Sequence, residues 1–123
     1  YPLAGQAALV VVRKNLEEQA GHREADDRVA EEWTGRTSLG DIDLAADGSE
    51  LFAVNLADRR IYRFALPSGA LLGSFPHGAA GETWAPSARP FGLAWHEGRL
   101  YHGVVDSAEE SGRRGDLRAV VYR

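Results

Sequence analysis

The sequence predicts an all-β fold, and three observations support this prediction. Short runs rich in β-branched and aromatic residues recur along the chain, as is typical of strands. Two acidic-glycine pairs, Asp47-Gly48 and Glu97-Gly98, separate consecutive runs and indicate hairpins, because Gly adopts the positive φ of tight turns. The first of these hairpin regions is similar to the second, about fifty residues further along the chain.

The internal similarity joins residues 40–54 to residues 90–104, with a single-residue gap opposite Ser49. Each copy has a short apolar strand, an acidic-glycine turn, and a second strand that opens with Leu and an aromatic residue. Extending the pattern in both directions predicts antiparallel strands over residues 8–13, 39–45, 50–55, 60–65, 70–75, 91–95, 99–105 and 117–122.

Four antiparallel strands in about fifty residues match the unit of a β-propeller blade. We therefore expect consecutive four-stranded blades of an incomplete ring. The assignment has five parts: the end of a blade (1–15), a polar insertion with a short helix near 24–33 (16–37), a full blade (38–76), a connecting loop (77–89) and most of the next blade (90–123). A closed propeller typically needs at least four blades, so the remainder of the chain or neighbouring subunits should complete the ring.

Composition excludes several classes of protein. The net charge of −4 argues against a nucleic-acid partner, which would favour a basic face. The absence of Cys excludes disulfides and thiolate zinc sites. The longest apolar run, residues 7–12, is too short to span a membrane. Because the chain begins at Tyr1, we expect it to be processed or a fragment, with any export signal upstream.

Several segments resemble known propeller families. Residues 51–55 and 61–64, followed by Pro67-Ser68-Gly69, resemble YVTN- and NHL-type repeats. Three more segments, 38–44, 88–93 and 100–109, resemble the propeller-like region of large secreted bacterial proteins that also carry immunoglobulin-like repeats of the SdrD B type. The resemblance implies an extracellular or cell-surface bacterial protein, and it carries over no catalytic residue.

The chain departs from that family at one pair of positions. The resembling proteins often have Cys where Asp106 stands, with a partner Cys in the loop that matches residues 77–89, and both are absent here. A disulfide therefore gives no support for export of this chain.

The blade assignment places three loops, 55–59, 77–89 and 106–116, on the face of a propeller that usually holds ligands. Candidate ligand-binding residues on that face and near the central channel are Asp41, Asn55, Trp84, Arg89 and Asp106.

Asp41 and Asp43 alternate on the expected innermost strand, so they share one side of it. They could hold calcium in an intact ring, because calcium prefers clustered carboxylate and carbonyl oxygens. Alternatively, Asp41 caps a turn by accepting backbone N–H bonds, and Asp43 pairs with an Arg. We expect no tightly bound metal on this chain alone, because the strand over 91–95 offers no side-chain oxygen.

Other polar groups are compatible with structural roles. Trp84 could stack on a sugar, anchor a protein partner, or simply pin its own loop. No Gly-x-Ser-x-Gly motif marks a serine nucleophile. No close-spaced ligand pair is formed by the four histidines, which are His22, His77, His96 and His102. The charged residues of the last long loop neutralise one another; they are Asp106, Glu109, Glu110, Arg113, Arg114 and Asp116.

These observations favour a non-catalytic scaffold or binding module for a protein or glycan, with no cofactor. The alternative is a calcium-dependent, lactonase-like hydrolase of the gluconolactonase type, which requires convergent oxygen ligands from different blades. The predicted core consists of Ile42, Leu44, Leu51, Ala53, Ile61, Leu71, Leu93, Leu100, Val104 and Val120.

Overall fold

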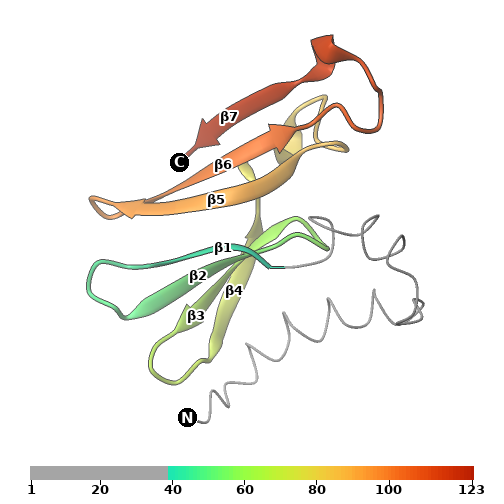
Figure 1. The fold of residues 1–123 in the computed structure, drawn as a ribbon. Coiled ribbons are helices and arrows are strands. Elements are labelled where there is room, and N and C mark those ends of the chain that lie inside the picture. Colours follow the sequence, from blue (N-terminus) through green and yellow to red (C-terminus); the bar gives the residue numbers. More distant parts are fainter. Residues whose placement is uncertain (1–38) are drawn as a thin grey trace, which may run out of the picture.

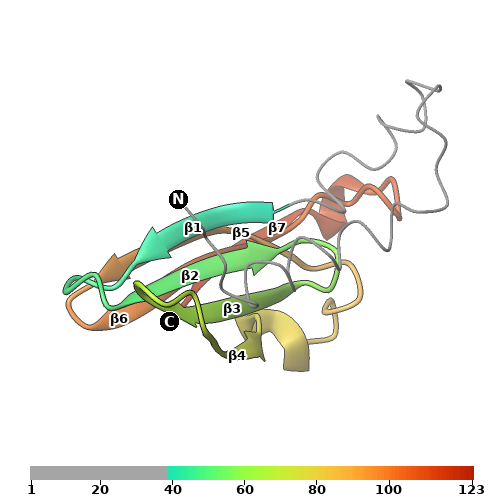
Figure 2. The ribbon, with the colours of Figure 1, turned by 90° about the horizontal axis from the view of Figure 1, so that it is seen from below.

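The computed structural model describes residues 39–123, which form two antiparallel sheets (Figures 1 and 2). The first sheet has the order β1 (Leu39–Leu44), β2 (Glu50–Asn55), β3 (Arg60–Ala65) and β4 (Leu71–Pro76). The second has the order β5 (Arg89–His96), β6 (Arg99–Asp106) and β7 (Arg118–Tyr122). Short 3-10 helices precede β5 and β7: η1 (Gly78–Gly81) and η2 (Arg114–Asp116).

The all-β prediction is confirmed for residues 39–123. Each strand predicted there is present, with ends that differ by no more than two residues. The predicted strand over residues 8–13 and the polar insertion over 16–37 lie outside the described residues.

Both acidic-glycine pairs form hairpin turns. Glu97 and Gly98 are the two central residues of the β5–β6 turn, and both have positive φ, 48° and 75°. The β1–β2 turn is longer: Gly48 has φ 68°, and Asp47 accepts hydrogen bonds from the backbone and hydroxyl of Ser49 at 3.0 and 2.7 Å. These side-chain bonds close the turn locally, so sequence alone identified it.

Each sheet has a β-bulge near the start of its first strand. Residues 40 and 41 of β1 lie opposite the single residue Val54, and residues 91 and 92 of β5 lie opposite Gly103. The register also corrects the sequence alignment. Ala45 pairs with Glu50 and His96 with Arg99, so the first turn is longer by two residues and not by one.

The sheets lie one over the other, with β1 beside β5 (Figures 1 and 2). An apolar cluster fills the space between them, and its centre is the aromatic stack of Phe52 on Trp95, with ring centroids 5.2 Å apart. Smaller clusters lie on the opposite face of the first sheet and beneath the β4–β5 connection. The buried members of the inter-sheet cluster are Ala45, Phe52, Val54, Leu56, Ile61 and Leu93.

The core prediction is confirmed in part. Ala53, Ile61, Leu93 and Val104 are buried, and Leu51 and Leu100 are half-buried. The prediction is wrong for four residues that are exposed: Ile42, Leu44, Leu71 and Val120. All four lie on β1, β4 or β7, which are edge strands of their sheets. An edge strand has a neighbour on one side only, so apolar residues on it gain less cover than those on central strands.

Candidate functional site

Three loops meet at the end of the sheets that lies opposite the β1–β2, β3–β4 and β5–β6 turns. The β2–β3 loop contacts the β4–β5 connection, because the guanidinium of Arg59 donates a hydrogen bond to the carbonyl oxygen of Pro86. The same connection contacts the end of β6 through Ser87 and Asp106. The loops over residues 55–59, 77–89 and 106–116 therefore lie at one end of the sheets.

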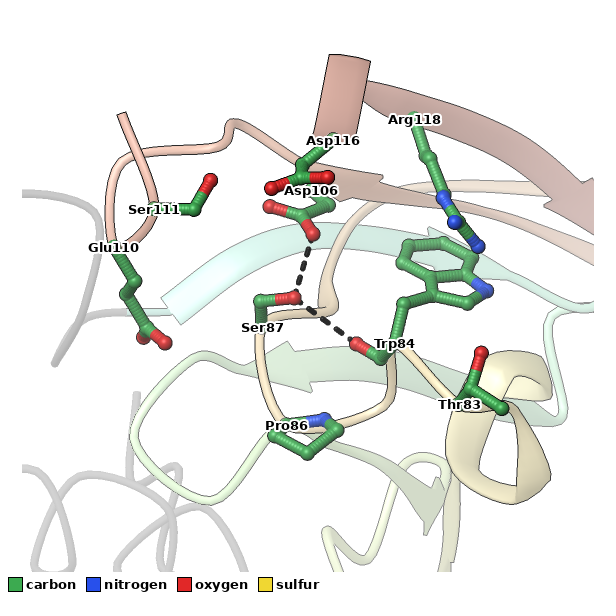
Figure 3. Close-up of a pocket in the computed structure, with 9 residues that line it drawn as sticks. All are labelled: Thr83, Trp84, Pro86, Ser87, Asp106, Glu110, Ser111, Asp116 and Arg118. Atoms are coloured by element: carbon green, nitrogen blue, oxygen red, sulfur yellow. Dashed lines mark hydrogen bonds between the residues drawn. The ribbon is translucent and has the colours of Figure 1, made fainter. Parts of the chain in front are cut away.

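A polar cleft of about 330 Å³ lies where two of these loops meet (Figure 3). One wall comes from the β4–β5 connection, and the other comes from the end of β6, the following loop and the start of β7. The lining residues are Thr83, Trp84, Pro86, Ser87, Asp106, Glu110, Ser111, Asp116 and Arg118.

The hydrogen bond between Ser87 and Asp106 joins the two walls (Figure 3). Ser87 Oγ lies 2.5 Å from Oδ2 of Asp106 and 3.1 Å from the carbonyl oxygen of Trp84. The other carboxylate oxygen of Asp106 accepts the N–H of Ala108 at 2.8 Å. The hydroxyl of Ser87, and next the N–H of Ala108, lower the pKa of Asp106, so its carboxylate is ionised at neutral pH.

Chemically, this pair is suited to holding the loops together. The lowered pKa keeps Asp106 in its charged form, and its two oxygens accept the hydroxyl of Ser87 and the N–H of Ala108. No histidine lines the cleft among residues 39–123. The pair therefore fixes the shape of the cleft.

Trp84 pins the β4–β5 connection onto the second sheet. Its side chain is 8% exposed and packs with Ala79, Ala88 and Val104. The guanidinium of Arg118 lies 5.8 Å from the ring centroid, at a distance typical of a cation–π contact. Trp84 is therefore not the exposed aromatic platform that stacking on a sugar would require.

The cleft is lined by charged side chains of both signs. Three carboxylates line it, from Asp106, Glu110 and Asp116, against the single guanidinium of Arg118. Arg89 lies beside the cleft, with its guanidinium 3.7 Å from Glu110. Asp116 pairs with Arg113 at 3.2 Å, so each of the three carboxylates already has a partner, and the lining favours ligands that form hydrogen bonds.

Asp41 and Asp43 lie away from the cleft and connect the two sheets. Each uses one carboxylate oxygen for the N–H of the next residue in β1. The second oxygen crosses to β5: Asp41 accepts the N–H of Leu93 at 2.9 Å, and Asp43 accepts that of Trp95 at 2.5 Å. Asp41 therefore accepts backbone N–H groups as the alternative predicted, but it joins two sheets and does not cap a turn. The prediction that Asp43 pairs with an Arg is wrong, because its oxygens accept the N–H groups of Leu44 and Trp95.

Asn55 is also separate from the cleft. It is fully buried at the end of β2, and its Oδ1 accepts the N–H of Ala57 at 3.2 Å. Its amide nitrogen has no hydrogen-bond partner in the described structure. Of the five predicted site residues, Trp84 and Asp106 line the cleft and Arg89 flanks it, whereas Asp41 and Asn55 lie elsewhere.

Sequence reasoning did not anticipate the roles of Ser87 and Arg118 in this cleft. Neither lies in a recognisable motif, and both reach the cleft only through the packing of two distant loops. The histidines show no convergence on the cleft: His96 is exposed beside Glu97, His77 and His102 are buried, and His22 lies outside the described residues.

Within residues 39–123, no group of three or more His, Asp or Glu is arranged to hold a metal ion. We expect calorimetric titration of the chain with calcium to show no micromolar binding, because both oxygens of Asp41 already accept N–H groups. Micromolar binding that disappears in Asp41→Asn would contradict this expectation and favour the lactonase-like alternative.

In the part of the chain that the structure describes, no helix is long and apolar enough to cross a membrane. Comparison with family models, curated proteins and solved structures found no match to this chain.

Proposed function

We propose that this chain is part of a β-propeller that acts as a non-catalytic scaffold or binding module at the surface of, or outside, a bacterial cell. The observation that carries the proposal is the way the sheets adjoin. Their first strands, β1 and β5, lie side by side and carry bulges at matching places. Successive propeller blades are four-stranded sheets arranged around a common axis, which requires first strands to be neighbours.

Exposed apolar residues on the outer strands support an incomplete ring. Leu71 and Leu72 on β4, and Val120 and Val121 on β7, are exposed at sheet edges. Long apolar edges invite further strands or sheets to cover them. Further residues of the same chain, or neighbouring subunits, would supply the remaining blades. The surface location rests on the resemblance of residues 38–44, 88–93 and 100–109 to secreted bacterial proteins.

The polar cleft supports a binding role with a protein or glycan as the ligand. Glycan hydroxyls and the basic side chains of a protein both donate hydrogen bonds to carboxylates. The cleft is built from loops on a rigid sheet scaffold, which is where binding sites are commonly found.

A rim substitution tests the proposal without disturbing the bonds that shape the cleft. Thr83 is exposed and lines the cleft, so Thr83→Arg adds bulk and positive charge there. We expect the labelled chain to bind a subset of an immobilised glycan array or a peptide array, and Thr83→Arg to lose at least tenfold in affinity, about 1.4 kcal/mol.

The matched control is Ser68→Arg, which adds the same side chain at the exposed turn between β3 and β4, at the opposite end of the sheets. It should bind as the unchanged chain does. Absence of binding on both arrays, or binding that Thr83→Arg leaves intact, would overturn the proposal.

A further inference from the structure

The β4–β5 connection is held against β6 at Gly78. The N–H of Gly78 donates a hydrogen bond to Nε2 of His102, at 2.8 Å. The imidazole of His102 stacks on Tyr122, with ring centroids 5.7 Å apart. A Cβ atom at Gly78 would lie 2.1 Å from Cγ of Tyr122, so glycine is required at this position. His102 and Tyr122 therefore fix the start of the connection that later contributes Trp84 to the cleft.

The bond to Gly78 requires the neutral form of His102. Because Nε2 accepts, the neutral ring carries its hydrogen on Nδ1, which is buried without a hydrogen-bond partner in the described structure. Protonation of Nε2 would replace the acceptor with a donor and turn two N–H groups toward each other. The imidazole is only 6% exposed, so water cannot readily solvate the new charge.

The surroundings of His102 disfavour its charged form on every side. His77, from the β4–β5 connection, is buried close enough to interact with it electrostatically. Arg99 of β6 and Arg123 after β7 line the same cavity as His102, and β4 contributes only the uncharged Phe75 and Pro76. The opposing residue on β5 is the uncharged Leu93, and no carboxylate lines this cavity among residues 39–123.

The pKa values of both His102 and His77 are lowered. Burial, and next the neighbouring His77, lower the pKa of His102. Burial, and next Arg59 from the β2–β3 loop, lower the pKa of His77. A histidine whose folded pKa is depressed contributes stability that is fully present above its unfolded pKa and is lost as pH falls below it.

We propose that His102, with His77 beside it, forms an acid-sensitive latch that releases the β4–β5 connection from β6 when the surroundings become acidic. Uptake of a proton by His102 breaks its bond to Gly78. The connection that opens carries Trp84 and Ser87, so acid loosens one wall of the cleft while the strands remain paired. Buried histidines between packed elements are known to act in this way in pH-sensitive proteins.

Amide hydrogen exchange of the whole chain tests the latch, with the protection factor of the Gly78 N–H measured by NMR between about pH 7.5 and pH 5. We expect protection to fall by up to about tenfold per pH unit for each proton taken up. His102→Gln keeps an oxygen that can accept the Gly78 N–H but does not titrate, so the pH dependence in this variant should be smaller by the share of one proton, with only the share of His77 left.

His96→Gln is the matched control, because His96 is exposed at the β5–β6 turn, and it should keep the pH dependence of the unchanged chain. If His102→Gln does not fold, the ring nitrogens of the unchanged chain give a second readout: Nδ1 should carry the hydrogen at neutral pH. Protection that does not change with pH, pH dependence that is undiminished in His102→Gln, or a hydrogen on Nε2 at neutral pH would each overturn the proposal.

Discussion

Replacing Ile61 with Ala is expected to lower the free energy of unfolding by about 2–5 kcal/mol. Ile61 lies on the central strand β3, is completely buried, and belongs to the cluster between the two sheets. The substitution removes three carbon atoms from a close-packed region, so it loses the transfer free energy of those atoms and leaves a cavity. Urea denaturation at pH 7, followed by circular dichroism, measures the loss.

Ile42→Ala is the matched control, because it makes the same chemical change on the edge strand β1, where Ile42 is 56% exposed. We expect it to cost less than about 1 kcal/mol. Equal losses at the two positions would mean that Ile42 is covered in solution and that the assignment of β1 as an edge strand is wrong.

Replacing Asp43 with Asn is expected to lower the free energy of unfolding by about 1–3 kcal/mol, as for hydrogen bonds to a charged group. Both carboxylate oxygens of Asp43 accept backbone N–H groups, from Leu44 and Trp95. An amide side chain has one oxygen, so its NH₂ group must face one of these N–H donors and that bond is lost. The same urea titration measures the effect.

The stability that Asp43 contributes should depend on pH. The N–H of Trp95, and next that of Leu44, lower the pKa of its carboxyl. Its contribution is therefore complete above the unfolded pKa of aspartate and is lost as pH falls through the lower folded value. The unchanged chain and Asp43→Asn should converge in acid.

Asp116→Asn is the control for Asp43→Asn. Asp116 makes an ion pair with Arg113 at 3.2 Å near the surface, and such pairs contribute less than about 1 kcal/mol. A larger loss in Asp116→Asn than in Asp43→Asn would contradict the assigned role of Asp43.

The sequence was sufficient to predict the strands and turns of residues 39–123, because local chemistry determines them. Gly48 and Gly98 supply positive φ, and β-branched and aromatic residues favour the strands between the turns. The sequence alignment of the two hairpins had a gap of one residue, and the structure requires a gap of two. Turn length does not follow from composition: the turn at Asp47 has two more residues than the turn at Glu97.

Contacts between distant segments could not be predicted in the same way. The alternation of Asp41 and Asp43 showed that they share a side of β1, but not that Leu93 and Trp95 would present their N–H groups to them. The error in the core prediction has a related cause. Period-two alternation selects one face of a strand, whereas Phe52, on the central strand β2, is buried on the opposite face from Ala53.

The candidate site was predicted only as a region. Loop length and polarity located the cleft, since long loops on a rigid scaffold commonly carry binding residues. The pairing of Ser87 with Asp106 depends on how two loops, nineteen residues apart at this contact, fold against each other. The burial of Trp84 depends on Ala79, Ala88 and Val104, which have no polar or aromatic signal of their own.

The two sheets adjoin along β1 and β5 through the carboxylates of Asp41 and Asp43. Hydrogen exchange of the Leu93 and Trp95 amides tests this arrangement most directly, because both N–H groups point away from β6 and would exchange rapidly on an unbridged edge. We expect both amides to be protected, with Asp41→Ala exposing Leu93 and Asp43→Ala exposing Trp95. Rapid exchange of both amides in the unchanged chain would contradict the account.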